Sequence, residues 1–313
     1  MFTPDLAVPA DPIVAVHGLA KKFGAHTAIA QLTIELHAGQ IFGLVGTNGG
    51  GKTTSLRMLA GLLKPDAGSG RVMGFDLLRD ATGIRRRVGY MSQAFSLYPS
   101  LSVLENLRFR ADVFSVAKPR QAAERVLHSF GLESFRHVHA QHLSGGWLRL
   151  LQLACALLHQ PRLVLLDEPT AGLDAAHRQS VWLRIMELAN EGASVVLSTH
   201  DLAEAQRCSK VALLSAGSVR TSGTIQSVID AARAIALLAT GERVLPLAVQ
   251  LAQQAAVIAS YPQGNSLRIV VKPEAVESIV QTITQHGCQH RHSALTFEDA
   301  ALALSRAGVG AIT

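Results

Sequence analysis

The segment Gly46-Thr47-Asn48-Gly49-Gly50-Gly51-Lys52-Thr53 limits the possible folds of this chain more than any other. It fits the pattern G-x-x-x-x-G-K-[ST], follows the apolar run 41–45 and precedes a helical pattern at 53–63. In that setting, glycines let backbone N–H groups surround phosphate oxygens, and the N-terminus of the helix adds positive potential. The alternative is a glycine-rich turn with a chance lysine, and the flanking strand and helix argue against it.

The same segment predicts a site for a nucleoside triphosphate. We expect Lys52 to reach the β- and γ-phosphates and the Thr53 hydroxyl to ligate Mg²⁺. The residues expected to surround the phosphates are Gly46, Thr47, Asn48, Gly49, Gly50, Gly51, Lys52, Thr53 and Thr54.

A second apolar run, 163–166, leads directly into Asp167 and Glu168. The carboxyl ends of buried parallel strands open onto the ligand crevice of an α/β sheet. We therefore expect Asp167 to hold Mg²⁺, directly or through water, and Glu168 to polarise the attacking water as a general base. An Asp-Glu pair alone is usually a solvated turn, but its place downstream of a phosphate loop favours the functional interpretation.

Apolar runs alternate with helical patterns through the first part of the chain. Continuous runs of leucine and β-branched residues between helices are typical of a largely parallel sheet that is covered on both faces. The runs expected to form its strands are 41–45, 88–91, 163–166, 194–197 and 211–214. We predict an α/β domain over residues 1–225, with a helical insert at about 95–160.

The pattern changes after about residue 225. Strands are predicted at 234–240, 256–261, 266–271 and 288–295, with helices at 244–254, 273–286 and 297–306. Up to residue 295 the order is βαββαβ, which is the ferredoxin-like split motif. Residues 226–313 are therefore expected to form a small α+β accessory domain.

Composition excludes several other classes of protein. The length of 313 residues allows two domains at about 150 residues each, and 48% hydrophobic with 17% charged residues argues against disorder. No apolar run approaches the ~18 residues that a membrane span requires. Residues 1–11 lack a visible secretory signal, and the three widely spaced cysteines favour a reducing cytosol.

The net charge of +6 is modest. Its densest basic cluster, Arg85-Arg86-Arg87, has no interleaved aromatic residues. We therefore expect no direct binding of nucleic acid.

Between the phosphate loop and the acidic strand lies Leu143-Ser144-Gly145-Gly146, which resembles the signature of ABC-type ATPases. Three further marks of that family follow its order: Gln93 in the position of the Q-loop glutamine, Gly172-Leu173-Asp174 as a D-loop, and His200 as the switch histidine. The resemblance covers residues 13–222 and implies a P-loop NTPase fold with a helical subdomain.

The resemblance also implies roles for single residues. Gln93 would contact Mg²⁺ or the attacking water and sense the transmembrane partner, and His200 would hold the γ-phosphate. Asp174 would communicate across a dimer of cassettes. Ser144, Gly145 and Gly146 would meet the γ-phosphate of the facing cassette.

Phe23 falls where the family stacks an aromatic ring on adenine. Such stacking needs only a π face, although a phenylalanine beside glycine is also an ordinary packing residue. His200 taken alone would more often be structural.

The sequence departs from the family after the signature. The family usually continues with Gln, a basic residue and Gln-Arg, whereas this chain has Trp147-Leu148-Arg149-Leu150. The polar contacts that those residues would make are either absent or made instead by Arg149 and Gln152. We expect this departure to affect the turnover of ATP and not its binding.

The segments 98–107 and 296–300 resemble bacterial drug and antibiotic exporters. The resemblance implies an ATP-hydrolysing subunit, with ATP and Mg²⁺, in a homodimer or heterodimer of cassettes. An integral membrane permease would be its partner, at the cytoplasmic face of the bacterial inner membrane. The alternative is a soluble ABC ATPase that acts on ribosomes or nucleic acid. A catalytically dead regulator is disfavoured, because Lys52, Asp167, Glu168 and His200 are all present.

His286, Cys288, His290 and His292 alternate along the chain. On a strand all four would project from one face, where imidazole and thiolate could bind zinc or copper. Structural zinc ligands usually have other spacings, so we favour an exposed polar face.

Overall fold

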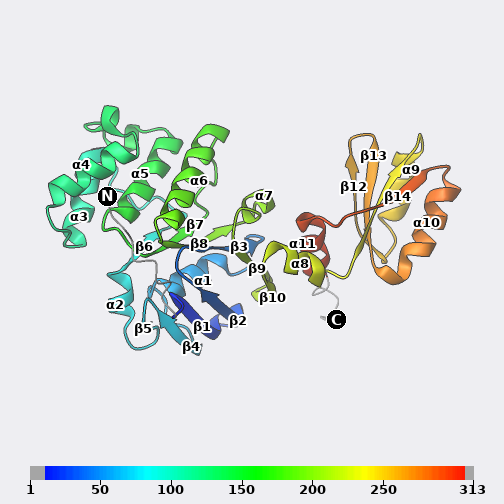
Figure 1. The fold of residues 1–313 in the computed structure, drawn as a ribbon, viewed down its shortest axis with the longest axis horizontal. Helices are drawn as coiled ribbons and strands as arrows, with labels where there is room; N and C mark the ends of the chain where they lie inside the picture. The colour runs from blue at the N-terminus through cyan, green and yellow to red at the C-terminus, as the bar shows by residue number, and fades with distance from the viewer. Residues whose placement is uncertain (1–10, 307–313) are drawn as a thin grey trace. The chain divides into compact units, whose positions relative to one another are not determined.

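The computed structural model describes residues 11–306, so the expectation for the amino-terminal residues 1–10 lies outside the described residues. The chain divides into two compact units, residues 1–209 with 216–218 and residues 210–215 with 219–313 (Figure 1). The domain limits expected from the sequence, 1–225 and 226–313, stay a prediction.

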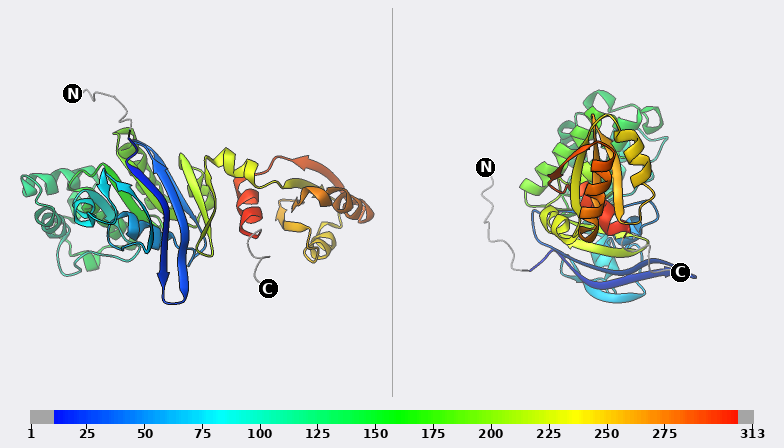
Figure 2. Two further views of the ribbon diagram at one scale, coloured as in Figure 1. Left: turned by 90° about the horizontal axis from the view of Figure 1, so that it is seen from below. Right: turned by 90° about the vertical axis from the view of Figure 1, so that its right-hand side faces the viewer.

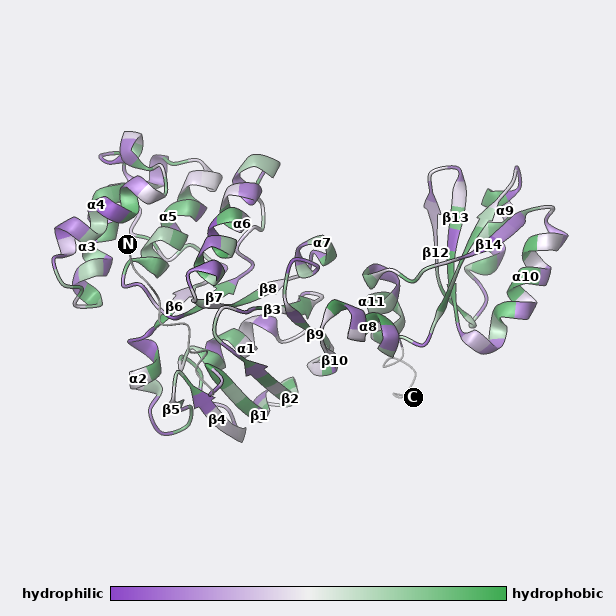
Figure 3. Ribbon diagram, in the orientation of Figure 1, coloured by the Kyte–Doolittle hydropathy of each residue, from purple (hydrophilic) through white to green (hydrophobic). Residues whose placement is uncertain are grey.

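A ten-stranded sheet has the strand order β5-β4-β1-β2-β10-β9-β3-β8-β7-β6. Strands β3, β8, β7 and β6 pair in parallel, as the continuous apolar runs predicted. Figure 3 shows the hydrophobic character of β7 and β8. The parallel strands and the β9–β10 pair have these bounds: β3 (Ile41–Gly46), β6 (Val88–Met91), β7 (Leu163–Asp167), β8 (Ser194–Thr199), β9 (Lys210–Ser215) and β10 (Ser218–Gly223).

The sequence did not reveal four antiparallel strands at one end of this sheet. They are β1 (Val14–Phe23), β2 (His26–Leu36), β4 (Ala67–Val72) and β5 (Phe75–Asp76). Strand β1 pairs with both β2 and β4, and Figure 2 shows β1 and β2 as long neighbouring strands, drawn in blue. The β1–β2 register is irregular, and the alternation of buried and exposed residues in β2 holds over Leu32–Leu36 but breaks over Ala28–Gln31, while β1 loses it after Val16. The periodicity of two that marks a half-buried strand is therefore weak.

Helices connect the strands of the first unit. Their bounds are α1 (Lys52–Leu59), α2 (Ala81–Arg85), α6 (Ala175–Asn190) and α7 (Leu202–Ala205). Helix α6 has the limits that its periodicity predicted. Asp174 ends the preceding loop and accepts hydrogen bonds from the backbone of Ala176 and His177, as an N-cap should.

The predicted helical insert is present. It contains α3 (Val103–Val113), α4 (Pro119–Ser129) and α5 (Gly145–Leu157), with short 3₁₀ turns η1 (Glu133–Phe135) and η2 (Ala140–His142) between α4 and α5. Ser102 and Glu105 form a capping box that fixes the start of α3. These helices cluster together in Figure 1, and α5 carries the signature at its first turn.

The second unit has a four-stranded sheet of order β12-β13-β11-β14 in which every pair is antiparallel. Its elements are α8 (Ile225–Ala231), β11 (Ile235–Thr240), α9 (Val244–Leu251), β12 (Val257–Gln263), β13 (Ser266–Val271), η3 (Pro273–Ala275), α10 (Val276–Gln285), β14 (Gln289–Ser293) and α11 (Phe297–Arg306). Leu237, Leu247, Ile269 and Ile283 are fully buried in its core.

A buried ion pair ties α11 to this sheet. Arg268 on β13 donates to both carboxylate oxygens of Asp299, at 3.1 Å from Nε and 2.5 Å from Nη2. Tyr261 on β12 donates its hydroxyl to the same carboxylate at 2.7 Å, and Thr296 donates its backbone N–H at 2.8 Å. Burial raises the pKa of Asp299, but these hydrogen bonds outweigh it and leave the pKa lowered.

The expectation that His286, Cys288, His290 and His292 share one strand face is wrong. His286 ends α10, and β14 begins only at Gln289. Cys288 is buried in the core, whereas His290 and His292 are exposed on the strand. Within residues 11–306, no group of three or more His, Cys, Asp or Glu side chains is arranged to hold a metal ion.

All three cysteines are free and buried. Burial raises the pKa of Cys155 and of Cys208 to about 12. In the described part of the chain, no helix has both the length and the apolar character needed to cross a membrane.

Candidate functional site

The predicted phosphate loop joins β3 to α1, as its pattern requires. Gly51 has φ +98, and an added Cβ would lie 2.3 Å from the Ile29 side chain and 2.5 Å from the Ala28 carbonyl oxygen. Gly49 also has a positive φ, of +78, but faces open space. The left-handed conformation and the close approach at Gly51 both demand glycine. The loop is thereby held open above the first turn of α1.

Lys52 lies at the floor of this loop and is 6% exposed. Its Nζ donates to the carbonyl oxygens of Gly46, at 2.7 Å, and Thr47, at 3.2 Å. The same nitrogen lies 3.2 Å from Oε1 of Glu168. The sequence-predicted phosphate ligand and the predicted general base are therefore in direct contact.

Glu168 occupies an unusual backbone conformation at the end of β7. Its φ is +50, in the left-handed region, which is uncommon for a residue with a side chain. The Ser198 hydroxyl accepts a hydrogen bond from its N–H at 2.8 Å, and Nδ1 of His200 lies 2.8 Å from its Oε2. Ser198 on β8 thus fixes the backbone of Glu168, and His200, just after β8, fixes its carboxylate.

Asp167 is 1% exposed and lies beside Thr53. Its Oδ1 accepts hydrogen bonds from the Thr53 hydroxyl at 3.1 Å and from the Ser198 hydroxyl at 2.7 Å. Its Oδ2 is buried without a hydrogen-bond partner. A carboxylate oxygen left free beside a threonine hydroxyl is a suitable donor set for Mg²⁺, which is usually held by one or two carboxylates together with substrate phosphates.

A cavity of about 460 Å³ lies over these residues. It is lined by residues 48–54, Glu168, Gln93 and Phe23, so most of the sequence-predicted site faces one space. Phe23 is 51% exposed, and the Lys21 Nζ lies over its ring at 5.7 Å from the centroid. His26 and Ala28 also line the cavity, and sequence reasoning missed both. The pairing of Phe23 with His26 across the β1–β2 turn explains their position.

The signature residues do not line this cavity. Ser144 is the N-cap residue of α5 but makes no side-chain cap hydrogen bond, and both Ser144 and Gly145 are exposed. Gly146 lies against the His177 ring, where an added Cβ would be 2.5 Å from ring carbon atoms. The ring of Trp147 meets the same histidine edge-on, with centroids 5.5 Å apart.

Asp174 lies at the start of α6 and not in the cavity. Its carboxylate accepts from Ala176 and His177 N–H groups at 2.9 and 3.0 Å and lies 2.6 Å from His177 Nδ1. Hydrogen bonds from the backbone and side chain of His177 lower the pKa of Asp174. The D-loop and the start of the signature helix therefore share His177 as a neighbour.

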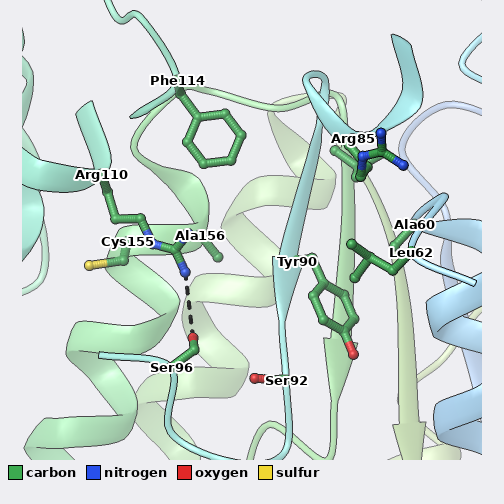
Figure 4. Close-up of a pocket in the computed structure, with 11 residues that line it drawn as sticks. Ala60, Leu62, Arg85, Tyr90, Ser92, Ser96, Arg110, Phe114, Cys155 and Ala156 are labelled. Carbon is green, nitrogen blue, oxygen red and sulfur yellow. Dashed lines mark hydrogen bonds between the residues drawn. The ribbon is translucent and has the colours of Figure 1, made fainter. Parts of the chain in front are cut away.

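A second pocket, of about 290 Å³, lies between β6 and the helical insert (Figure 4). Leu62, Tyr90, Phe114 and Arg110 line it, and Arg110 reaches the Ser96 hydroxyl at 3.5 Å. The Phe114 ring stacks on His159, with centroids 3.9 Å apart. Burial lowers the pKa of His159 to about 4, so its ring is neutral near pH 7.

Comparisons with known proteins agree with this geometry. The family model described as ABC transporter matches residues 29–171. The "Probable multidrug ABC transporter ATP-binding protein YbhF" of Escherichia coli (strain K12) is 39% identical over 274 residues, which are 85% of this chain and 47% of that protein. The Nod factor export ATP-binding protein I of Cupriavidus metallidurans is 39% identical over 222 residues, or 70% of this chain and 73% of that protein.

A solved structure gives the same result for the fold. The dimeric, post-hydrolysis state of the ATP-binding cassette MJ0796 bound to ADP and Pi matches with a TM-score of 0.63 and 26% sequence identity. The match covers 67% of this chain and 98% of that one.

The chain therefore belongs to the ABC transporter family, and its first part is the ATP-binding cassette of that family. This confirms the resemblance and the P-loop ATPase fold that it implied. The chain spans about half the length of the first curated relatives that it matches, at 47% of each.

Proposed function

We propose that this protein is the ATP-binding and ATP-hydrolysing subunit of a bacterial ABC exporter of drugs or other amphipathic molecules. One observation carries the proposal. The Lys52 ammonium, the Glu168 carboxylate and the His200 imidazole are joined by contacts of 3.2 and 2.8 Å beside the phosphate loop. This is a phosphate ligand, a general base and an orienting group in one place.

In the proposed reaction Glu168 takes a proton from the attacking water. Lys52 would leave Oε1 of Glu168 when phosphate oxygens become available, because its ammonium is a compact charge on a flexible stem. His200 would keep its hydrogen bond to Oε2, so that the base stays oriented. His200 is 58% exposed, which leaves it free to contact the γ-phosphate as well.

We assign ATP to the cavity, with Phe23 against adenine and residues 46–54 around the phosphates. Thr53 and Asp167 would hold Mg²⁺, with Gln93 near the ion or the attacking water. The unpartnered Oδ2 of Asp167 supports this assignment. When bound, Mg²⁺ would neutralise charge on the β- and γ-phosphates.

We also propose that two cassettes, identical or different, share each site. Ser144, Gly145 and Gly146 are absent from the lining of their own cavity, and the first two are exposed, so they are available to a facing copy. They would stabilise the γ-phosphate of that copy, and Asp174 would communicate between the two.

An integral membrane permease is the proposed further partner, at the cytoplasmic face of the inner membrane. Large apolar side chains are exposed around the second pocket and the helical insert, namely Leu62 (52%), Phe95 (50%), Tyr98 (48%), Phe109 (39%) and Val113 (56%). Exposed apolar groups gathered in this way suit a protein partner better than solvent. The names of the relatives support export over action on ribosomes or nucleic acid.

We further propose that residues 226–313 form a ferredoxin-like accessory domain that supplies no catalytic residue. The order βαββαβ of the elements from β11 to β14 supports this assignment. The site residues named above all precede residue 226.

Two measurements test the function. Purified protein should hydrolyse ATP, and the rate should fall when Mg²⁺ is chelated. Affinity purification from membranes should recover an integral membrane protein. Recovery of ribosomes or nucleic acid without a permease would favour the soluble alternative.

A further inference from the structure

Arg149 is a buried cation that contacts the backbone at Gln93 and at Glu168. It stands on the signature helix α5, where the family usually has glutamine, and it is only 4% exposed. Its Nη1 donates to the Gln93 carbonyl oxygen at 2.9 Å and lies 3.5 Å from that of Ser92. Its other terminal nitrogen lies 3.4 Å from the Glu168 carbonyl oxygen. One guanidinium thus contacts the backbone of both the Q-loop and the general base.

Gln152, one turn further along α5, holds the same loop. It is 2% exposed, and its Nε2 donates to the carbonyl oxygens of Ser92, at 3.0 Å, and Ala94, at 2.9 Å. Its Oε1 accepts from Arg149 at 3.1 Å. The two side chains form one unit, here called the Arg149–Gln152 clamp.

The charge of Arg149 is balanced without a direct ion pair. Burial lowers the pKa of its guanidinium, and the nearby carboxylates of Asp167 and Glu168 act in the opposite direction. The Phe95 ring lies 5.1 Å from the guanidinium carbon and covers one side of it. Because arginine is effectively always protonated in proteins, these groups hold a permanent cation at this point.

The clamp contacts the backbone carbonyl groups of Gln93 and Glu168 and those of the two neighbours of Gln93, Ser92 and Ala94. The carbonyl oxygens of Gln93 and Glu168 belong to residues whose side chains line the cavity. The φ of +50 at Glu168 makes its peptide costly to hold without support. A guanidinium is a fork of fixed geometry with several N–H donors, so it can support two separate peptides at once, which a lysine ammonium cannot do as well.

We infer that the Arg149–Gln152 clamp is a positioning device that fixes Gln93 and Glu168 relative to the signature helix and so sets the rate of the chemical step. The inference rests on the proposed ATPase function. It also gives a role to the departure from the family pattern after the signature. Neither residue of the clamp lines the cavity, so neither is a catalytic residue.

The first test compares Arg149→Met and Arg149→Lys in the full chain by steady-state hydrolysis. Arg149→Met should lower kcat by about 10-fold or more, as expected when a catalytic group is displaced, while KM changes by less than about 2-fold. Arg149→Lys keeps the charge and one donor, and should recover part of kcat. The matched control is Arg136→Met, which removes a helical-insert ion pair to Glu124 and should leave kcat unchanged.

The second test does not depend on hydrolysis. Phe95 is exposed and follows the clamped carbonyls, so chymotrypsin should cut after it faster in Arg149→Met and in Gln152→Leu than in the unmodified chain. In the hydrolysis assay of the first test, the double variant Arg149→Met/Gln152→Leu should lose less kcat than the product of the two single losses, because both residues hold the same loop. Arg136→Met should not change the cutting rate.

The outcomes separate the two proposals. Unchanged cutting after Phe95 in folded Arg149→Met overturns the clamp, whether or not the chain hydrolyses ATP. Faster cutting with unchanged kcat overturns its role in positioning. A loss of kcat that Arg149→Lys does not relieve, with KM raised in parallel, also contradicts positioning. Failure of the unmodified chain to hydrolyse ATP overturns the proposed function, and the clamp is then judged by proteolysis alone.

Discussion

Lys52 and Glu168 form an ion pair in which Nζ and Oε1 are 3.2 Å apart and each side chain is 6% exposed. The pair joins the phosphate loop to the end of β7. Buried charges of this kind must be paired, because an unpaired ion in such a place is costly. The contact therefore holds the two side chains together beside the phosphate loop.

The first prediction concerns Glu168. Glu168→Gln should keep the binding of ATP but lower turnover by at least ~10²-fold, as expected when a general base is removed. Equilibrium binding of a fluorescent ATP analogue and steady-state hydrolysis measure the two effects. Lys52→Ala is the comparison, and it should weaken nucleotide binding itself. Hydrolysis by Glu168→Gln at the parental rate would show that the base is another group.

The second prediction uses mixed dimers to test shared sites. With Lys52→Ala and Ser144→Arg on the same chain, paired with an unmodified chain, both sites contain one damaged part. With the two changes on opposite chains, one site keeps all its parts. Activity should survive, at a reduced level, only in the second arrangement. The reverse result would mean that the signature acts within its own chain. If the partner is a different cassette, the same test must be run on that heterodimer.

The third prediction concerns the contact between Gly146 and His177. Gly146→Ala would place a methyl group 2.5 Å from the histidine ring, so overpacking should lower the free energy of unfolding by about 1–3 kcal/mol. Gly145→Ala is the matched control, because an added Cβ there meets nothing within 4 Å. Chemical denaturation measures the free energy of unfolding of both variants. Adding His177→Ala should relieve the loss at position 146, and no relief would mean that the ring is not the obstacle.

The fourth prediction concerns Asp299, whose carboxylate holds Arg268. Asp299→Asn leaves a buried arginine without its counter-ion and should cost about 3–5 kcal/mol of stability in the second unit. Calorimetric unfolding of the full chain measures this loss. Asp230→Asn, at an exposed aspartate of α8, is the control and should have little effect.

The same carboxylate predicts a pH dependence. The pKa of Asp299 is lowered in the folded protein from its ordinary value of 3.8. Its contribution to stability is therefore complete above pH 3.8 and is lost as the pH falls from there through the folded-state pKa. The unfolding temperature of the second unit should fall in that acidic range more steeply in the unmodified chain than in Asp299→Asn. Parallel curves of unfolding temperature against pH for the two proteins would contradict this prediction.

The parts of the fold that depend on strong local signals were predictable from the sequence. Buried parallel strands carry continuous apolar runs, and the limits of α6 follow from a capping aspartate and a long periodic pattern. Strands β1, β2, β4 and β5 were missed, because their residues are partly exposed and β4, Ala67–Val72, contains two glycines. Their pairing is a long-range property that no local pattern records.

The candidate site was likewise predictable where it depends on local motifs and not where it depends on long-range strand pairing. The motif pattern predicted that the phosphate loop and the pair Asp167-Glu168 belong together, and the structure places Lys52 against Glu168 and Thr53 against Asp167. The lining position of His26 depends on the β1–β2 turn, which was not predicted. The burial of Cys288 away from His290 was also missed, because a strand was expected to begin one residue earlier than β14 does.

The burial of Cys155, Cys208 and Cys288 has a practical consequence for the study of this molecule. Alkylating reagents attack the thiolate, and the raised pKa of about 12 at Cys155 and Cys208 keeps those sulfurs protonated. Cys155 and Cys208 should therefore be silent toward maleimide in the folded state, and burial in the core of the second unit shields Cys288 from the reagent. A single cysteine introduced on the surface could then carry a dye or a spin label, with the native cysteines left in place.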